Sequence, residues 1–285
     1  MLVRGKKTKM ELPFQPKKKW GQNFLLDKNF LQKIVNNCPI DEKTIIVEIG
    51  SGYGHLTEFI AKTNCYQVVS CEKDVQLYLW LQNKWNKEQK NKVVFLHQDA
   101  LKINWPEFWR KYTNNQSLTF LIVGNLPYSI ANSLIFSLLE NIELFKNLVF
   151  LVQKEVSQRW VAAPQKYKKE YSAFSVYISL ITNPEIIFFV PKQCFFPQPS
   201  VDGALIRLEI KKEVQLEKER WPKFWAFLKN CFRHRRKTLW NNLLIASYPK
   251  EKIREVFQQL NYEGVVRPQQ LTTQDYLKIF RLVCR

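Results

Sequence analysis

The sequence predicts an α/β fold with a mostly parallel sheet, followed by an all-helical region at the C-terminus. Over the first two thirds of the 285 residues, short apolar runs alternate with longer amphipathic stretches. Such strand–helix alternation is typical of a parallel sheet. After Lys212 the pattern becomes helical. We expect parallel strands at residues 45–49, 67–71, 93–97, 120–123 and 148–153.

Helices are expected between these strands, at residues 56–62, 75–85 and 132–140. Three later apolar runs are spaced closely enough to complete the sheet by antiparallel pairing, at residues 175–182, 185–190 and 204–210. Helices of the C-terminal region are expected at residues 221–232, 239–246, 250–260 and 274–283. A boundary near Glu213 divides the chain into a basic arm of residues 1–20, an α/β domain of residues 21–213 and a helical domain of residues 214–285.

Positive charge is concentrated at the two ends of the chain. The sequence has 44 Lys and Arg against 25 Asp and Glu, a formal net charge of +19. Residues 1–20 carry +6 and residues 211–285 carry +10, whereas the long middle carries only +3. A single basic run is often no more than solvated surface, but two runs flanking an enzyme-like body favour an extended polyanion as partner. Nucleic acid is the first expectation and an anionic membrane the second.

Several classes of protein are excluded by what the sequence lacks. The N-terminus is basic without an apolar core, which argues against a secretory signal. The longest uncharged run, residues 112–139, contains asparagines and a proline that a bilayer would penalise. The six cysteines form no CxxC pair and no His/Cys cluster at zinc-ligand spacing. We therefore expect a soluble, cytoplasmic protein with reduced thiols and no metal.

A glycine-rich turn follows the first predicted strand. Gly50, Gly52 and Gly54 lie between this strand and a helix, where the backbone must turn sharply and approach a ligand closely. Such turns are weak evidence alone, because many are dinucleotide fingerprints or simple turns. Here the third glycine comes two residues after the second, and Glu48 precedes the turn. S-adenosylmethionine, which has a sulfonium cation and no phosphates, suits an acidic residue at this place better than a dinucleotide does.

Two carboxylates follow the next two strands. Glu72 lies 22 residues beyond Gly50, where a carboxylate can accept hydrogen bonds from both ribose hydroxyls in NAD and S-adenosylmethionine sites alike. Asp99 follows the third strand and is placed to accept a hydrogen bond from an adenine amino group. An alternative for Asp99 is a helix N-cap. Three sites at successive strand ends form a stronger constellation than any one of them.

The fourth strand ends in a turn whose residues could take part in catalysis, Asn125-Leu126-Pro127-Tyr128. The exocyclic amine of adenine is a poor nucleophile because its lone pair is delocalised into the ring, so acceptors aimed at the amine hydrogens promote attack. The Asn125 side-chain oxygen and the Leu126 carbonyl are candidate acceptors. Pro127 fixes φ, and Tyr128 offers a ring on which an extruded base can stack. The alternative is an ordinary turn.

The chain resembles the rRNA adenine N-methyltransferase family in four segments: NLPY at residues 125–128, WGQNFL at 20–25, EIGSGYGHLT at 48–57 and FFPQPSVDGALIRL at 195–208. FRHRRKTLWNNLL at residues 232–244 resembles the small-subunit branch, the 16S rRNA adenine dimethyltransferases. Two residues depart from that branch: Ser51 replaces a frequent proline, and Gly203 replaces a frequent serine. Ser51 matches the large-subunit resistance branch, which lacks the RRKTLxNNL pattern.

The resemblance implies a class I S-adenosylmethionine-dependent methyltransferase, with a Rossmann-like sheet in residues 21–213 and a helical RNA-binding domain after it. It implies transfer of four methyl groups, two to each of two adjacent adenines in the 3′-terminal hairpin of small-subunit rRNA, within a pre-30S particle. Cofactor contacts would fall on Asn23, Leu25, Gly50, Gly52, Glu72, Asp99 and Asn125. Catalytic or target-base positions would be Asn125, Leu126, Pro127, Tyr128 and Phe195.

The remaining expectations concern the base pocket and the RNA. Pro197 and Pro199 stiffen a loop that can hold Phe195 opposite Tyr128, although a hydrophobic plug is the alternative. Phosphate contacts are expected at Lys17, Lys18, Lys19, Arg233, Arg235, Arg236 and Lys237. Some of the four cations from Arg233 to Lys237 could instead brace the interdomain junction through carboxylates. We expect a monomer.

Three rival functions remain at this stage. The same chemistry could act on a large-subunit adenine and confer drug resistance. The fold could also belong to a non-catalytic RNA-binding assembly or transcription factor, although the intact Glu72, Asp99 and NLPY turn argue against it. A nicotinamide-dependent dehydrogenase is the weakest alternative.

Overall fold

The computed structural model describes residues 13–17, 20–85, 91–114 and 117–284, without the Tyr128 side chain. In this part of the chain a seven-stranded sheet has the order β4-β3-β2-β5-β6-β9-β7. The first five strands in that order are parallel, and β9 and β7 are antiparallel to their neighbours. The strands are β2 (Thr44–Ile49), β3 (Gln67–Glu72), β4 (Val93–His97), β5 (Thr119–Asn125), β6 (Phe145–Gln153), β7 (Thr182–Val190) and β9 (Gly203–Ile210).

The α/β fold and the five parallel strands are confirmed, but one predicted strand is wrong. Residues 175–182 belong largely to helix α8 (Ala173–Ile181), which is buried along almost its whole surface. A short apolar run buried on all sides has the same pattern in a helix and in a central strand, so periodicity could not separate the two. Ser175 Oγ accepts a hydrogen bond from Ser172 N and donates one to Arg159 O, which fixes the start of α8.

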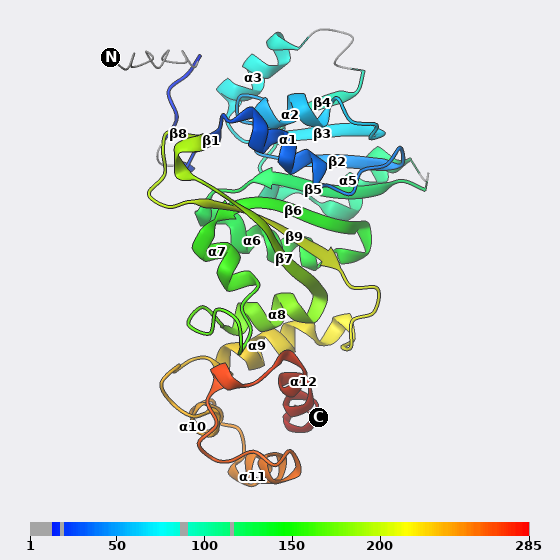
Figure 1. Ribbon diagram of the computed structural model, residues 1–285. Coiled ribbons are helices and arrows are strands. Elements are labelled where there is room, and N and C mark those ends of the chain that lie inside the picture. Colours follow the sequence, from blue (N-terminus) through cyan, green and yellow to red (C-terminus); the bar gives the residue numbers. More distant parts are fainter. Residues whose placement is uncertain (1–12, 18–19, 86–90, 115–116, 285) are drawn as a thin grey trace, which may run out of the picture.

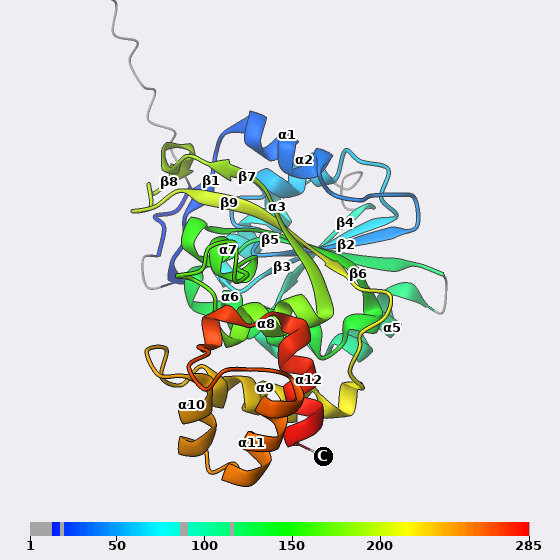
Figure 2. The ribbon, with the colours of Figure 1, turned by 60° about the horizontal axis from the view of Figure 1, so that its bottom comes forward.

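Helices cover both faces of the sheet (Figures 1 and 2). One face carries α1 (Lys28–Asn36), α2 (His55–Ile60) and α3 (Val75–Lys84), and the other carries α5 (Trp105–Thr113), α6 (Tyr128–Leu139), α7 (Lys154–Trp160) and α8. Successive residues of a strand point to opposite faces of the sheet. Ile46 therefore packs in the core under α1, α2 and α3, and Ile45 packs in the core on the other face. Helices α1, α5 and α7 were not predicted, and η2 (Ala100–Lys102) and η3 (Ile142–Leu144) are short connecting turns.

A second, two-stranded sheet ties the N-terminal segment to a distant loop. β1 (Phe24–Leu25) pairs antiparallel with β8 (Phe195–Phe196), which follows the turn η4 (Lys192–Cys194). Leu25 is opposite Phe195 in this register. The pairing therefore brings two segments singled out in the sequence to the same end of the main sheet.

The four predicted C-terminal helices are confirmed as α9 (Trp221–Cys231), α10 (Leu239–Ile245), α11 (Lys250–Gln259) and α12 (Thr273–Val283), with the turns η5 (Lys218–Arg220) and η6 (Pro268–Gln270). Figure 2 shows these helices beneath α8. One apolar core continues from the sheet through α8 into α9 and α12. Tyr171 OH also donates to Leu271 O across this junction. The boundary near Glu213 remains a proposal.

Helices long and apolar enough to cross a membrane are absent from the described residues. The cysteines are free thiols, and the described residues contain no cluster of three potential metal-binding side chains.

Candidate active site

A cavity of about 560 Å³ opens at the carboxyl ends of β2, β3, β5 and β6. This is the edge at which parallel α/β sheets bind ligands. Most of the predicted ligand-binding residues line it, including Asn23, Gly50, Gly52, Glu72, Asp99, Asn125, Leu126, Pro127 and Phe195. The fold thus brings together residues that are more than 170 positions apart in the sequence.

The glycine-rich turn forms one wall of this cavity. Gly50 has φ +80° and Gly52 has φ +56°, a left-handed region that side chains other than glycine rarely adopt. A Cβ on Gly52 would also lie 2.7 Å from the Phe24 ring. Gly50 N donates to Cys71 O at 2.8 Å, which ties the turn to the end of β3. These residues must therefore be glycine for the turn to close against the N-terminal segment.

Glu72 is held rigidly at the end of β3. Oε2 accepts a hydrogen bond from Gly52 N at 2.9 Å, and Oε1 accepts one from Asp74 N at 2.8 Å. The side chain is buried, and burial raises the pKa of the carboxyl group. Each carboxylate oxygen keeps a further lone pair, so this geometry fits a pair of ribose hydroxyls.

Asp99 lines the cavity and is also an N-cap. Oδ1 accepts from Leu101 N at 3.1 Å at the start of η2, and Oδ2 pairs with Lys73 Nζ at 2.8 Å. Partial burial opposes ionisation, but the Lys73 ammonium and the Leu101 amide outweigh it and lower the pKa of Asp99. The capping alternative is therefore present, and the adenine contact stays a prediction. The Lys73 pair was missed by sequence reasoning.

The turn after β5 is anchored from both sides. Asn125 Nδ2 donates to Asn23 O at 2.7 Å, so its amide oxygen is the free end of the side chain in the cavity wall. Leu126 N donates to Leu151 O at 2.9 Å, which fixes the orientation of that peptide. Pro127 has φ −59° and precedes α6. The Tyr128 ring lies outside the described residues, so its stacking role stays a prediction.

Phe195 is 7 % exposed and lines the cavity from β8. A Cβ on Gly203 would lie 2.9 Å from Phe195 Cζ, so the ring lies directly against the β9 backbone. The glycine at position 203, where the small-subunit branch frequently has serine, therefore lets the Phe195 ring approach strand β9 closely. Leu25 differs from the other predicted cofactor residues: it does not line this cavity, and its side chain belongs to the apolar core. Its cofactor contact stays a prediction.

Glu48 does not line the cavity either, although the sequence placed it beside the ligand. It is 1 % exposed, and Oε2 accepts hydrogen bonds from Thr57 Oγ1 and Ser70 Oγ. Ser70 Oγ also contacts Ser51 Oγ at 2.6 Å. Ser51, which departs from the proline frequent in the small-subunit branch, therefore belongs to this hydrogen-bond network. Burial raises the pKa of Glu48 to about 7. Glu48 therefore supports the glycine-rich turn from beneath.

The C-terminal cations Arg233, Arg235, Arg236 and Lys237 are exposed in the loop between α9 and α10. None of the four forms an ion pair with a described carboxylate, which disfavours bracing through carboxylates. The buried Asn242 holds this loop through His234 N, His234 O and Thr238 O. Sequence reasoning gave Asn242 no role.

Only one of the three predicted cations of the N-terminal arm is described. Lys17 Nζ pairs with Asp74 at 2.8 Å, whereas Lys18 and Lys19 lie outside the described residues. The phosphate contacts of all three stay predictions. The Lys17–Asp74 pair spans 57 residues of sequence, and no local pattern signals it.

Comparison with known proteins gives consistent results. The family model "Ribosomal RNA adenine dimethylase" matches residues 13–284. The "Ribosomal RNA small subunit methyltransferase A" of Caldanaerobacter subterraneus is 34 % identical over 92 % of this chain and 95 % of its own length. Its counterpart from Mycoplasma mobile is 36 % identical over 93 % and 96 %.

Two solved structures share the fold. The dimethyladenosine transferase of Plasmodium falciparum superposes with a TM-score of 0.77 at 23 % identity, covering 90 % of this chain and 96 % of that one. The 23S rRNA methyltransferase ErmE superposes with a TM-score of 0.68 at 21 % identity, covering 92 % and 100 %.

Proposed function

The chain belongs to the ribosomal RNA adenine dimethylase family, and from this premise we propose that it dimethylates two adjacent adenines in the 3′-terminal hairpin of small-subunit rRNA during ribosome biogenesis. It is a class I methyltransferase that uses S-adenosylmethionine. The observation that carries the small-subunit assignment is the match to small-subunit methyltransferases over more than nine tenths of the chain, the helical C-terminal region included.

The cavity residues fit the cofactor. Glu72 presents a fixed carboxylate for ribose, Asp99 presents an acceptor for the adenine amine, and the glycine-rich turn admits close approach of a ligand to the backbone. S-adenosylmethionine supplies an electrophilic methyl group when it is bound. Asn23, Leu25, Gly50 and Gly52 complete the proposed binding set.

The chain's own contribution to the reaction is to position and polarise the target amine. The Asn125 amide oxygen and the Leu126 carbonyl accept hydrogen bonds from the amine hydrogens and so favour the form with a localised lone pair. Phe195, and Tyr128 in the proposal, hold the flipped base between aromatic surfaces. A proton leaves the amine after attack, and no strong base is required. Alignment of the two reacting groups supplies much of the acceleration.

The RNA is held through its phosphates in this proposal. The loop between α9 and α10 carries four of the proposed phosphate contacts, Arg233, Arg235, Arg236 and Lys237. The other three, Lys17 to Lys19, directly precede in the sequence the cavity-lining residues that begin at Trp20. The exposure of the four C-terminal cations supports this role, because exposed cations outside ion pairs can displace counterions from RNA. Arg235 Nη2 also donates a hydrogen bond to Lys169 O. The proposal includes a pre-30S particle as substrate, a monomeric enzyme and a cytoplasmic location.

The deciding experiment measures transfer from labelled S-adenosylmethionine to small ribosomal subunits that lack the modification, with nucleoside mass spectrometry of the product. Dimethyladenosine confined to the 3′-terminal hairpin is the expected result. Purified large subunits are the matched control substrate. Transfer to large-subunit RNA alone would move the assignment to the resistance branch, transfer to neither would favour a non-catalytic factor, and monomethyladenosine alone would contradict dimethylation.

A further inference from the structure

Part of the N-terminal segment lines the cofactor cavity, and this segment is hydrogen-bonded to the rest of the fold at several points. We call residues 14–17 and 20–25 the strap; Trp20, Gly21, Gln22, Asn23 and Phe24 of the strap line the cavity. Phe14 O accepts from Tyr53 OH at 2.5 Å near one end, and Asn23 O accepts from Asn125 Nδ2 at the other. The strap therefore forms part of the cavity wall.

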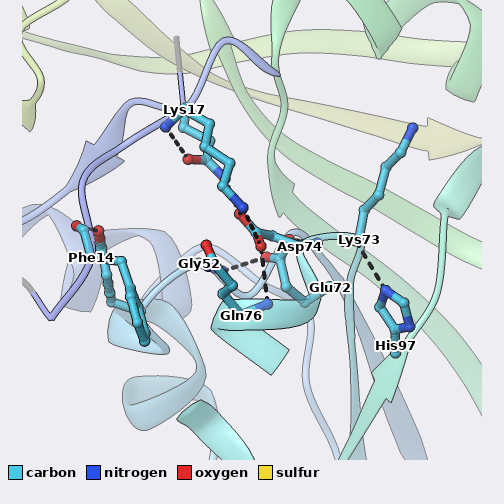
Figure 3. A network of polar contacts seen from close by, with 10 residues as sticks. Phe14, Lys17, Gly52, Glu72, Lys73, Asp74, Gln76 and His97 are labelled. Atoms are coloured by element: carbon cyan, nitrogen blue, oxygen red, sulfur yellow. Dashed lines mark hydrogen bonds and ion pairs between the residues drawn. The ribbon is translucent and has the colours of Figure 1, made fainter. Parts of the chain in front are cut away.

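The central fastening is an ion pair between Lys17 and Asp74 (Figure 3). Lys17 Nζ lies 2.8 Å from each carboxylate oxygen of Asp74. The Asp74 side chain is 3 % exposed, and the Lys17 side chain is 31 % exposed. Within the strap, Lys17 N donates to Gln22 Oε1 at 2.7 Å, which folds the segment back on itself. Charges at such a nearly buried carboxylate are screened much less than surface charges.

The same carboxylate is coupled to the ribose-binding position. Asp74 N donates to Glu72 Oε1, and Asp74 Oδ1 accepts from Gln76 N at the start of α3. Figure 3 shows Lys17 reaching from the strap to Asp74 beside Glu72 and Gly52. One short turn therefore holds both the strap and the carboxylate that the cofactor requires.

We propose that Lys17 and Asp74 are positioning residues that latch the strap over the cofactor cavity and set the rate at which cofactor and product leave. The inference rests on the proposed assignment of the cavity as the cofactor site. Four methyl transfers require four cofactor molecules, so the latch must hold each one long enough to react and still open between transfers. For Lys17 this role replaces the phosphate contact proposed above, because its ammonium group is paired with Asp74 and acts on the cofactor through the strap.

The test compares Lys17→Met with the wild-type full-length chain. We measure the dissociation rate and Kd of S-adenosylhomocysteine, together with hydrogen exchange of strap amides. Because the ion pair joins two parts of this chain, its loss should let the strap open more often. Cofactor release is therefore expected to accelerate on the order of tenfold, with faster exchange in the strap. Lys17→Arg should restore much of both. Lys218→Met is the matched control, since Lys218 forms an exposed pair with Glu143 outside the cavity and should leave both values unchanged.

A double variant separates the latch from general damage to the fold. Lys17→Met leaves the Asp74 carboxylate buried without its cation, and Lys17→Met/Asp74→Asn removes that charge. The double variant should recover melting temperature while cofactor release stays fast. Unchanged release and exchange in Lys17→Met would overturn the latch, as would weaker RNA binding with unchanged cofactor release, which would assign Lys17 to phosphate. Failure of the wild-type chain to bind the cofactor would instead overturn the proposed function, and the latch with it.

Discussion

Asn242→Ala is expected to weaken RNA binding without removing a single charge. Asn242 is fully buried, and its amide makes three hydrogen bonds to the backbone of the loop that carries Arg233 to Lys237: Oδ1 accepts from His234 N at 2.9 Å, and Nδ2 donates to His234 O at 3.1 Å and to Thr238 O at 3.0 Å. Alanine removes all three at once. The basic loop then loses its side-chain hydrogen bonds from α10, while Arg235 keeps its contacts with Lys169 O and Gln269 Nε2.

The magnitude follows from those three bonds. A net contribution of about 1 kcal/mol for each gives roughly 2–3 kcal/mol, because the freed loop groups of His234 can reach water. A domain of ordinary stability survives this loss. Since the loop must be ordered again when RNA binds, the same free energy weakens RNA affinity by roughly 30–140-fold at 1.4 kcal/mol for each factor of ten.

The assay is a titration of the 3′-terminal hairpin RNA at several salt concentrations. Asn242→Ala should lower affinity at every concentration while the slope of log affinity against log salt is unchanged, because all four cations remain. Arg236→Gln should instead reduce that slope by about 1. Asn241→Ala is the matched control, since its side chain is exposed on the same helix. Wild-type affinity in a folded Asn242→Ala chain, or a reduced slope, would refute the reasoning.

The remaining predictions concern the cavity and the turn beneath it. Glu72→Ala should abolish measurable cofactor binding by calorimetry while hairpin binding persists; retained affinity would exclude the ribose role. Asn125→Ala should lower methyl transfer on the order of 100-fold with RNA affinity intact, and a wild-type single-turnover rate would contradict the acceptor role. Gly203→Ala should destabilise the fold by about 1–3 kcal/mol in chemical denaturation, because its Cβ collides with the Phe195 ring; an unchanged midpoint would show that the ring yields freely. Glu48 has a pKa raised from 4.5 to about 7 in the fold, so its contribution to stability is present below pH 4.5 and is lost as the pH rises through 7. Glu48→Gln should remove that loss in unfolding curves recorded across this window, and a wild-type pH profile in the variant would refute it.

Local patterns predicted much of the fold because they report the backbone period directly. The glycine-rich turn, the NLPY turn and five parallel strands could be identified from spacing and apolar runs. A buried strand followed by a helix produces a recognisable pattern of apolar and polar residues within about 20 residues of sequence. Residues 175–182 were the exception. A helix buried on every side has no polar face, so its sequence does not distinguish it from a central strand.

The direction of buried side chains could not be predicted in the same way. Glu48 precedes the glycine-rich turn and carries the right charge for a ligand contact, yet it accepts hydrogen bonds from Thr57 and Ser70 beneath the turn. Which of two faces a strand residue meets depends on where the neighbouring helices pack. That choice is made by the whole core.

The sequence by itself determined the chemistry that the chain can offer at the ends of its strands: the Glu72 and Asp99 carboxylates, the Asn125 amide and the flexible Gly50 and Gly52. Only the tertiary structure decided how that chemistry is enclosed. Lys17 meets Asp74 across 57 residues, and β1 meets β8 across a still longer separation. Neither contact has a local signature, because the energy of such a contact depends on distance in space and on burial, and both are set by the path of the folded chain.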